Sequence, residues 1–129
     1  MDTAKLLSSV PTGLWIGGEE RQGKSTFNVL DPSDDSVLTA VADGTAQDAI
    51  AALDAAIAVQ EEWAATPPRE RGEILRAVFE KITDRAEDIA TLMTLEMGKV
   101  LPESMGEVKY GAEFFRWFAE EAVRIAGRF

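Results

Sequence analysis

The 129-residue chain contains no cysteine and no histidine. Without cysteine it cannot form a disulfide or present a thiolate nucleophile, and without either residue it cannot build a Cys/His zinc site. A histidine general base is excluded in the same way. Any chemistry carried by these residues must therefore come from carboxylates, Lys, Ser, Thr or Tyr.

Positive charge and long apolar runs are also scarce. Lys and Arg number 13 against 23 Asp and Glu, for a formal net charge of −10. An acidic chain repels phosphate backbones, so we expect no nucleic-acid partner. No run of apolar residues is long enough to span a bilayer, so we expect no membrane partner. The first segment, MDTAKLLSSVPTG, is a poor secretion signal, which favours a cytoplasmic location.

The apolar content of 46% is sufficient for a core, and the hydrophobic period changes once along the chain. Residues 1–12 are typical of a short amphipathic helix or arm that ends at Pro11. Residues 14–44 then show short apolar runs and the turn sequence DPSDD, which predict two hairpin-like pairs with three or four short strands.

From Thr45 onward the pattern is helical. Thr45 followed by Asp48 is a variant of the capping box, and the apolar spacing after it predicts a helix over 46–65. Further helices are expected from Pro68, over about 84–97 with Gly98 as its stop, and from Pro102 to about Ala126 with Gly127 as its stop. The fold class is therefore α+β and mostly α. Residues 1–44 form an arm and β-ribbon, and residues 45–129 contain four helices.

The segment from Gly18 to Ser25, GEERQGKS, satisfies the phosphate-loop pattern G-x-x-x-x-G-K-[ST]. A working phosphate loop opens a helix, whereas the strand pattern TFNVL and a proline turn follow here. Glu19 and Glu20 would also place two negative charges inside the anion cradle. We interpret the segment as a solvated hairpin turn in which Gly23 takes a positive φ, and nucleotide binding is the least favoured alternative.

The fourth expected helix carries two apolar stripes. Positions 108, 112, 115, 119 and 122 form one stripe, and the second is formed by Tyr110, Phe114, Trp117 and Phe118. A helix that is apolar over two faces is buried on two sides, and the other three helices can cover only one of them. The second stripe therefore indicates contact with further protein. One hypothesis is a stand-alone interaction module that uses this aromatic face and the β-ribbon to associate with itself or with a full-length relative.

Several segments, in order along the chain, resemble the N-terminal portion of an NAD(P)-dependent aldehyde dehydrogenase. They are LWIGGE, the run from TFNVLDPSDDSV to PPRERGEIL, ATLMTLEMGK, and GEVKYGAEFFRWFAEEAVRIAGRF. The combination of TLEMGK with the final segment is most similar to the succinate-semialdehyde dehydrogenase branch. In that family a thiolate attacks an aldehyde, a hydride passes to the nicotinamide and the thioester is hydrolysed.

The resemblance implies that the family's oxyanion-stabilising Asn, glycine-rich cofactor loop, general-base Glu and catalytic Cys lie outside these residues. We therefore expect no NAD or NADP bound to this chain, no catalytic residue in it, and no aldehyde oxidation by it alone. Its partners would be a second copy or the rest of a dehydrogenase. The resemblance also implies that the β-ribbon joins a subunit-bridging sheet, and that the helices form one side of the cofactor-binding domain.

The same resemblance assigns candidate sites residue by residue. Tyr110 and Phe114 look like part of the wall of a substrate tunnel. Glu96, where the family usually has Asp, would hold a monovalent cation together with the backbone carbonyls near Val29 and Leu30. A last pair of residues, Arg116 and Arg124, could attract a carboxylate substrate, although arginines on an exposed helix usually face water.

Overall fold

The computed structural model describes residues 3–125 and divides them into two compact units. The first holds the residues up to Ala64 together with Leu95–Gly98. The second holds Ala65–Thr94 and the residues from Lys99 onward. The expected division between residues 44 and 45 follows the change from strand to helix, whereas the compact units group the first long helix with the strands.

Two antiparallel hairpins follow a short helix, α1 (Thr3–Ser8), as the sequence predicts. In the first, β1 (Leu14–Ile16) pairs with β2 (Glu19–Arg21); in the second, β3 (Ser25–Leu30) pairs with β4 (Val37–Asp43). The turn between β1 and β2 consists of two glycines with φ of +65° and +82°, a region that L side chains rarely adopt. The ability of glycine to adopt a positive φ therefore sets the position of the turn in the first hairpin.

The prediction for Gly23 is wrong, because the positive φ angles fall at Gly17 and Gly18 instead. Gly23 has a different constraint: a Cβ there would lie 3.0 Å from the Cβ of Ala42, so the glycine permits a close approach to β4. The segment Glu19–Arg21 is a strand rather than a turn, and Ser25 begins another strand. No helix N-terminus follows the phosphate-loop pattern, which contradicts the nucleotide-binding alternative.

Helix α2 (Ala46–Ala65) has the predicted bounds and the predicted cap. The backbone N–H of Thr45 donates to Asp48 Oδ2 at 2.8 Å, and the Asp48 N–H donates to Thr45 Oγ1 at 3.2 Å. These reciprocal bonds satisfy groups that a helix start otherwise leaves without a partner. No residue of α2 is buried.

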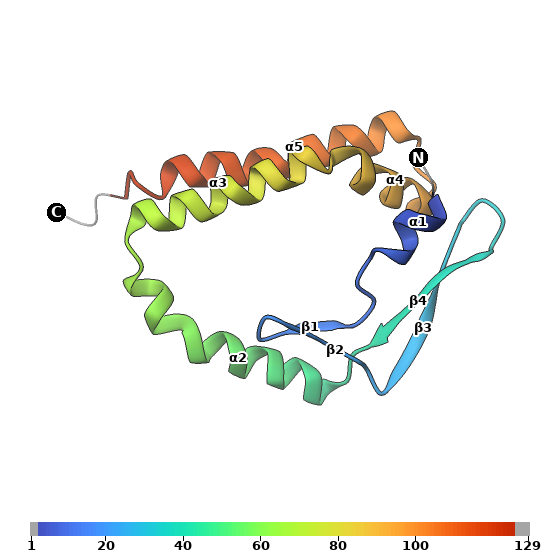
Figure 1. The fold of residues 1–129 in the computed structure, drawn as a ribbon, viewed down its shortest axis with the longest axis horizontal. Coiled ribbons are helices and arrows are strands. Elements are labelled where there is room, and N and C mark those ends of the chain that lie inside the picture. The colour runs from blue at the N-terminus through green and yellow to red at the C-terminus, as the bar shows by residue number, and fades with distance from the viewer. Residues whose placement is uncertain (1–2, 126–129) are drawn as a thin grey trace. The chain divides into compact units, whose positions relative to one another are not determined.

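In the second unit, α3 (Pro68–Asp84) lies alongside α5 (Leu101–Glu121) (Figure 1). The helices approach closely at Gly72, where a Cβ would lie 2.8 Å from the carbonyl oxygen of Ala119. The start of α3 at Pro68 is confirmed. A proline suits the first helical turn because its missing N–H would have no partner there.

Helix α4 (Ala86–Met97) is followed by Gly98, whose φ of +71° confirms the predicted glycine stop. Within the second unit, α4 meets α5 at a hydroxyl pair, Thr94 and Ser104, whose oxygens are 3.0 Å apart. Ser104 is fully buried, as is Ala90. A buried hydroxyl needs a partner, and Thr94 supplies it.

The last helix is shorter than predicted. Its end at Glu121 precedes the expected end near Ala126, because the Arg124 N–H donates to the Glu121 carbonyl in a tighter i,i+3 turn. Gly127 and Phe129 lie outside the described residues. No helix within residues 3–125 combines the length and hydropathy needed to cross a bilayer.

Candidate functional site

Helix α5 has one buried and one exposed apolar face, as its two stripes predict. Val108 and Ala112 are buried, whereas Phe115 in the same stripe remains 36% exposed. On the other face, Tyr110 is 69% and Phe114 is 48% exposed, and their rings meet edge to face with centroids 5.0 Å apart. Such a pair has a favourable quadrupole geometry and holds both rings in place.

The exposed face of α5 forms an apolar groove of about 460 Å³, lined by Tyr110, Glu113, Phe114, Trp117 and Phe118. Glu113 was not singled out from the sequence, although it lies three residues after Tyr110 and hence on a neighbouring row of the helix. The groove can bind an apolar surface or an extended apolar ligand. It presents neither a thiol nor an imidazole, so it can position a molecule but offers no strong nucleophile.

The three residues of the candidate cation site lie in the first unit. Glu96 is exposed near the end of α4, Val29 is half-buried and Leu30 is exposed at the end of β3. The two segments meet where a Cβ on Gly98 would lie 3.0 Å from Pro32 Cγ. Within residues 3–125, no group of three or more Asp and Glu side chains could hold a metal ion. Any cation here would need backbone carbonyls, as the hypothesis requires.

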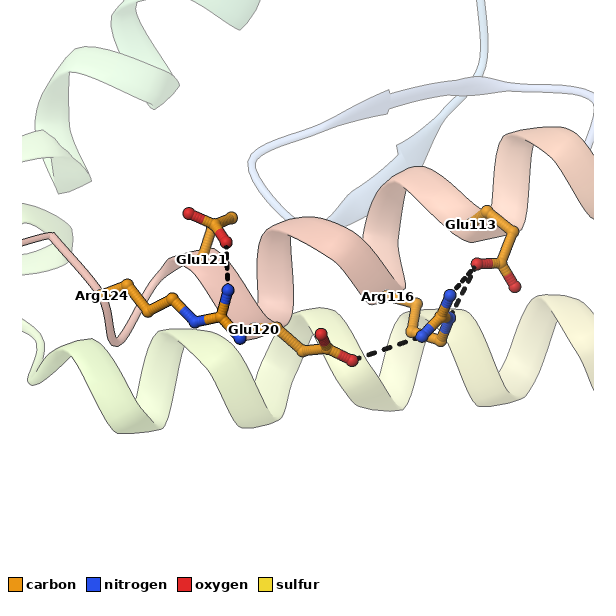
Figure 2. Close-up of polar contacts among 5 residues, drawn as sticks. All are labelled: Glu113, Arg116, Glu120, Glu121 and Arg124. Carbon is orange, nitrogen blue, oxygen red and sulfur yellow. Dashed lines mark hydrogen bonds and ion pairs between the residues drawn. The ribbon is translucent and has the colours of Figure 1, made fainter.

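The two candidate arginines are both engaged by glutamates of their own helical turns (Figure 2). Arg116 Nε donates to Glu113 Oε2 at 2.7 Å, and its Nη1 lies 3.4 Å from Glu120 Oε1. The hydrogen bond with Glu113 raises the pKa of Arg116. Arg124 Nη1 donates to Glu121 Oε1 at 2.9 Å, close to the end of the helix.

Both guanidinium groups are exposed and already paired. A substrate carboxylate would have to displace a neighbouring glutamate, so neither arginine is a prepared carboxylate site. The expectation that these side chains face water is confirmed.

Comparison with known proteins supports the resemblance seen in the sequence. The profile of the aldehyde dehydrogenase family matches residues 18–129. A succinate-semialdehyde dehydrogenase of Paenarthrobacter nicotinovorans is 59% identical over 93 residues, which cover 72% of this chain and 21% of that protein.

Solved structures agree with the fold. An NADP-dependent enzyme of Escherichia coli superimposes with a TM-score of 0.91 at 35% identity, over 99% of this chain and 26% of that one. Betaine aldehyde dehydrogenase of Staphylococcus aureus, in complex with NAD⁺, superimposes with a TM-score of 0.87 at 32% identity, over 92% of this chain and 24% of that one. The chain thus spans about a fifth to a quarter of the length of the proteins it matches. Together, the profile match, the sequence identities and the shared fold show that the chain belongs to the aldehyde dehydrogenase family.

Proposed function

We propose that these residues are the N-terminal segment of an NAD(P)-dependent succinate-semialdehyde dehydrogenase and supply scaffold and contact surface rather than reactive groups. The observation that carries this proposal is the 59% identity to the Paenarthrobacter nicotinovorans enzyme over 72% of the chain. The proposal includes a cytoplasmic location.

The residues present do not fit a dinucleotide. Such a site needs a glycine-rich turn between a strand and a helix, and the only phosphate-loop pattern in the sequence leads from β2 into β3. In a complete dehydrogenase, NAD or NADP accepts the hydride from the substrate. The contribution of this chain to that reaction is the shape of the passage, with the exposed rings of Tyr110 and Phe114 as part of an apolar wall.

Two further roles belong to the proposal. The hairpins of residues 14–43 present strand edges that could extend a sheet across subunits, since a two-stranded ribbon leaves backbone groups available on its outer edges. Glu96, with carbonyls near Val29 and Leu30, would hold a monovalent cation. Its support is the contact of Gly98 with Pro32, which brings the end of α4 to the residues that follow β3.

A chimera tests the proposal. In the Paenarthrobacter nicotinovorans enzyme, the N-terminal region that corresponds to this chain is replaced by the whole 129-residue chain. We expect NAD(P)H formation that depends on succinate semialdehyde, and none from the pure 129-residue chain. A folded but inactive chimera would contradict the dehydrogenase assignment, and NAD(P)H formation by the isolated chain would contradict the scaffold role.

The same chimera tests the wall of the passage. Replacing Tyr110 and Phe114 together by Ala should raise KM for succinate semialdehyde several-fold, because the substrate loses apolar contacts, and leave the Kd for the dinucleotide unchanged. The matched control is Trp63→Ala, which removes another exposed aromatic ring on α2. Equal effects of the two changes on KM would remove Tyr110 and Phe114 from the proposed wall.

A stand-alone interaction module is the second candidate, and the exposed aromatic side chains of α5 favour it. Tyr110, Phe114, Trp117 and Phe118 are between 48% and 69% exposed. Exposed apolar side chains gathered on one face mark a surface that contacts further protein. Adding the chain in trans to the Paenarthrobacter nicotinovorans enzyme that lacks its matched segment should restore activity if the partner is the rest of a dehydrogenase. Unrestored activity would favour association of the chain with itself.

A further inference from the structure

The phosphate-loop pattern from Gly18 to Ser25 has no part in the proposed function, yet one of its side chains makes a specific contact. Strand β2 places Glu20 opposite Trp15 of β1. The Glu20 side chain reaches past the start of that strand, where its Oε1 accepts the backbone N–H groups of Thr12, at 3.0 Å, and Gly13, at 2.7 Å. The pattern that suggested a cradle for an anion therefore supplies an anion instead.

The N–H groups of Thr12 and Gly13 form a small anion site. Backbone N–H groups of successive residues that point at one oxygen attract negative charge, because each N–H carries a partial positive charge. Hydrogen bonds to a carboxylate are also shorter and stronger than those between neutral groups, and the 2.7 Å at Gly13 lies in their range. The Glu20 carboxylate is thus an internal ligand of this site.

The absence of a side chain at Gly13 makes room for the contact. A Cβ at this position would lie 2.6 Å from Glu20 Cγ and 2.9 Å from Glu20 Oε1. It would also lie 2.7 Å from the backbone carbonyl oxygen of Arg21. These separations are shorter than side-chain carbons adopt, so a glycine is required where the Glu20 side chain crosses the backbone.

The linker that holds the anion site, residues 9–13, connects three parts of the first compact unit. It follows α1, whose Leu6 is buried, and it leads into β1 at Leu14. The Thr12 carbonyl oxygen accepts the N–H of Ala42 at 2.8 Å, so the linker is bonded to β4 as well as to β2. Release of Glu20 would therefore loosen the contact of the linker with both hairpins.

We propose that Glu20 is a latch, whose carboxylate fills the anion site of Thr12 and Gly13 and holds the linker between α1 and β1 against the first hairpin. The ligand class of the site is a carboxylate. Glu20→Ala removes a CH₂–COO⁻ group, which free acetate reproduces, so acetate should bind in the vacated space. This inference goes beyond the proposed function and does not depend on it.

Amide hydrogen exchange of the 129-residue chain, followed residue by residue by NMR, tests the latch. Glu20→Ala should accelerate exchange at Thr12 and Gly13 by about ten-fold or more, and also at Ala42, because local opening frees all three N–H groups. The matched control is Glu19→Ala, which changes the same residue type on the opposite face of the same strand and should leave these rates unchanged. Unchanged exchange in Glu20→Ala, or equal acceleration in Glu19→Ala, would refute the latch.

Acetate distinguishes an anion site from a general loss of structure. In Glu20→Ala, acetate should reverse most of the acceleration at Thr12 and Gly13, whereas chloride at the same ionic strength should not. In Gly13→Ala, exchange at Thr12 should also be faster, but acetate should not slow it, because the Glu20 side chain is still present and the added Cβ occupies the space. If acetate fails to slow exchange in a Glu20→Ala chain that keeps its helices by far-UV circular dichroism, the anion site is refuted, and the chimera experiment is unaffected.

Discussion

At the scale of single residues, the start of α2 depends on two side chains. Thr45 and Asp48 exchange hydrogen bonds, and the Thr45 hydroxyl also donates to Asp48 Oδ2 at 2.6 Å. These bonds favour the carboxylate form, so they lower the pKa of Asp48, the hydroxyl bond being the largest cause. The negative charge also interacts favourably with the helix N-terminus.

A pH dependence follows from the lowered pKa of Asp48. A carboxyl whose folded-state pKa is depressed stabilises the fold above its unfolded pKa, near 3.9, and loses that contribution as pH falls through the folded value. Asp48→Ala should therefore lower the melting temperature at pH 7, and the difference from the unchanged chain should shrink below pH 4. Thermal unfolding followed by circular dichroism at several pH values measures this. A difference that is constant down to pH 2.5 would contradict the role of the charge.

The cap at Thr45 and Asp48 can be predicted from the sequence because the two residues are only three positions apart. The prediction for Gly23 fails because the contact that requires a glycine there is with a residue far along the chain. A glycine in a polar run is typical of a turn, so positive φ was expected. The structure instead requires Gly23 for its approach to Ala42, which lies on a strand nineteen positions later. A contact across a hairpin depends on strand register, which composition alone does not specify.

At the scale of elements, helix types and starts follow from local patterns, and the end of α5 does not. Its apolar stripes continue past Glu121, so periodicity extends the helix towards Ala126, but the chain turns at Arg124. In the candidate site, too, local patterns predict only part of the structure. The exposure of Tyr110 and Phe114 follows from the sequence, because the last helix carries two apolar stripes and the other helices can cover only one. The adjoining groove at Leu75 depends instead on how α3 packs against α5.

The packing of α3 against α5 yields a test at Gly72. A Cβ at this position would lie 2.8 Å from the Ala119 carbonyl oxygen, and a backbone atom cannot move aside without shifting its helix. Gly72→Ala should therefore destabilise the fold by about 1–3 kcal/mol, in spite of the better helix propensity of alanine. Urea denaturation followed by circular dichroism measures the change.

The matched control for that test is Gly106 on α5, where an added Cβ meets no atom within 4 Å. Gly106→Ala should stabilise the chain by up to about 1 kcal/mol, since only the conformational cost of glycine is removed. If Gly72→Ala were also stabilising, α3 and α5 would be less closely packed at Ala119 than the structure shows.

At the scale of the whole molecule, apolar surface and net charge oppose each other. The exposed aromatic side chains of α5 favour association, but every copy carries a formal charge of −10. Two such copies with centres about 25 Å apart repel by roughly 16 kcal/mol in water without salt. Repulsion between the copies therefore opposes self-association where no salt screens it.

If the chain associates with itself, as the second candidate function requires, salt should strengthen that association. The Debye length falls from about 30 Å at 0.01 M to about 8 Å at 0.15 M, which reduces the repulsion between copies from several kcal/mol to less than about 1 kcal/mol. We expect the dissociation constant to fall at least ten-fold between these salt concentrations, as measured by sedimentation equilibrium. Trp117→Ala should remain largely monomeric at both, because screening supplies no apolar contact. If salt instead weakened the association, charge pairs rather than the exposed aromatic rings of α5 would hold the two copies together.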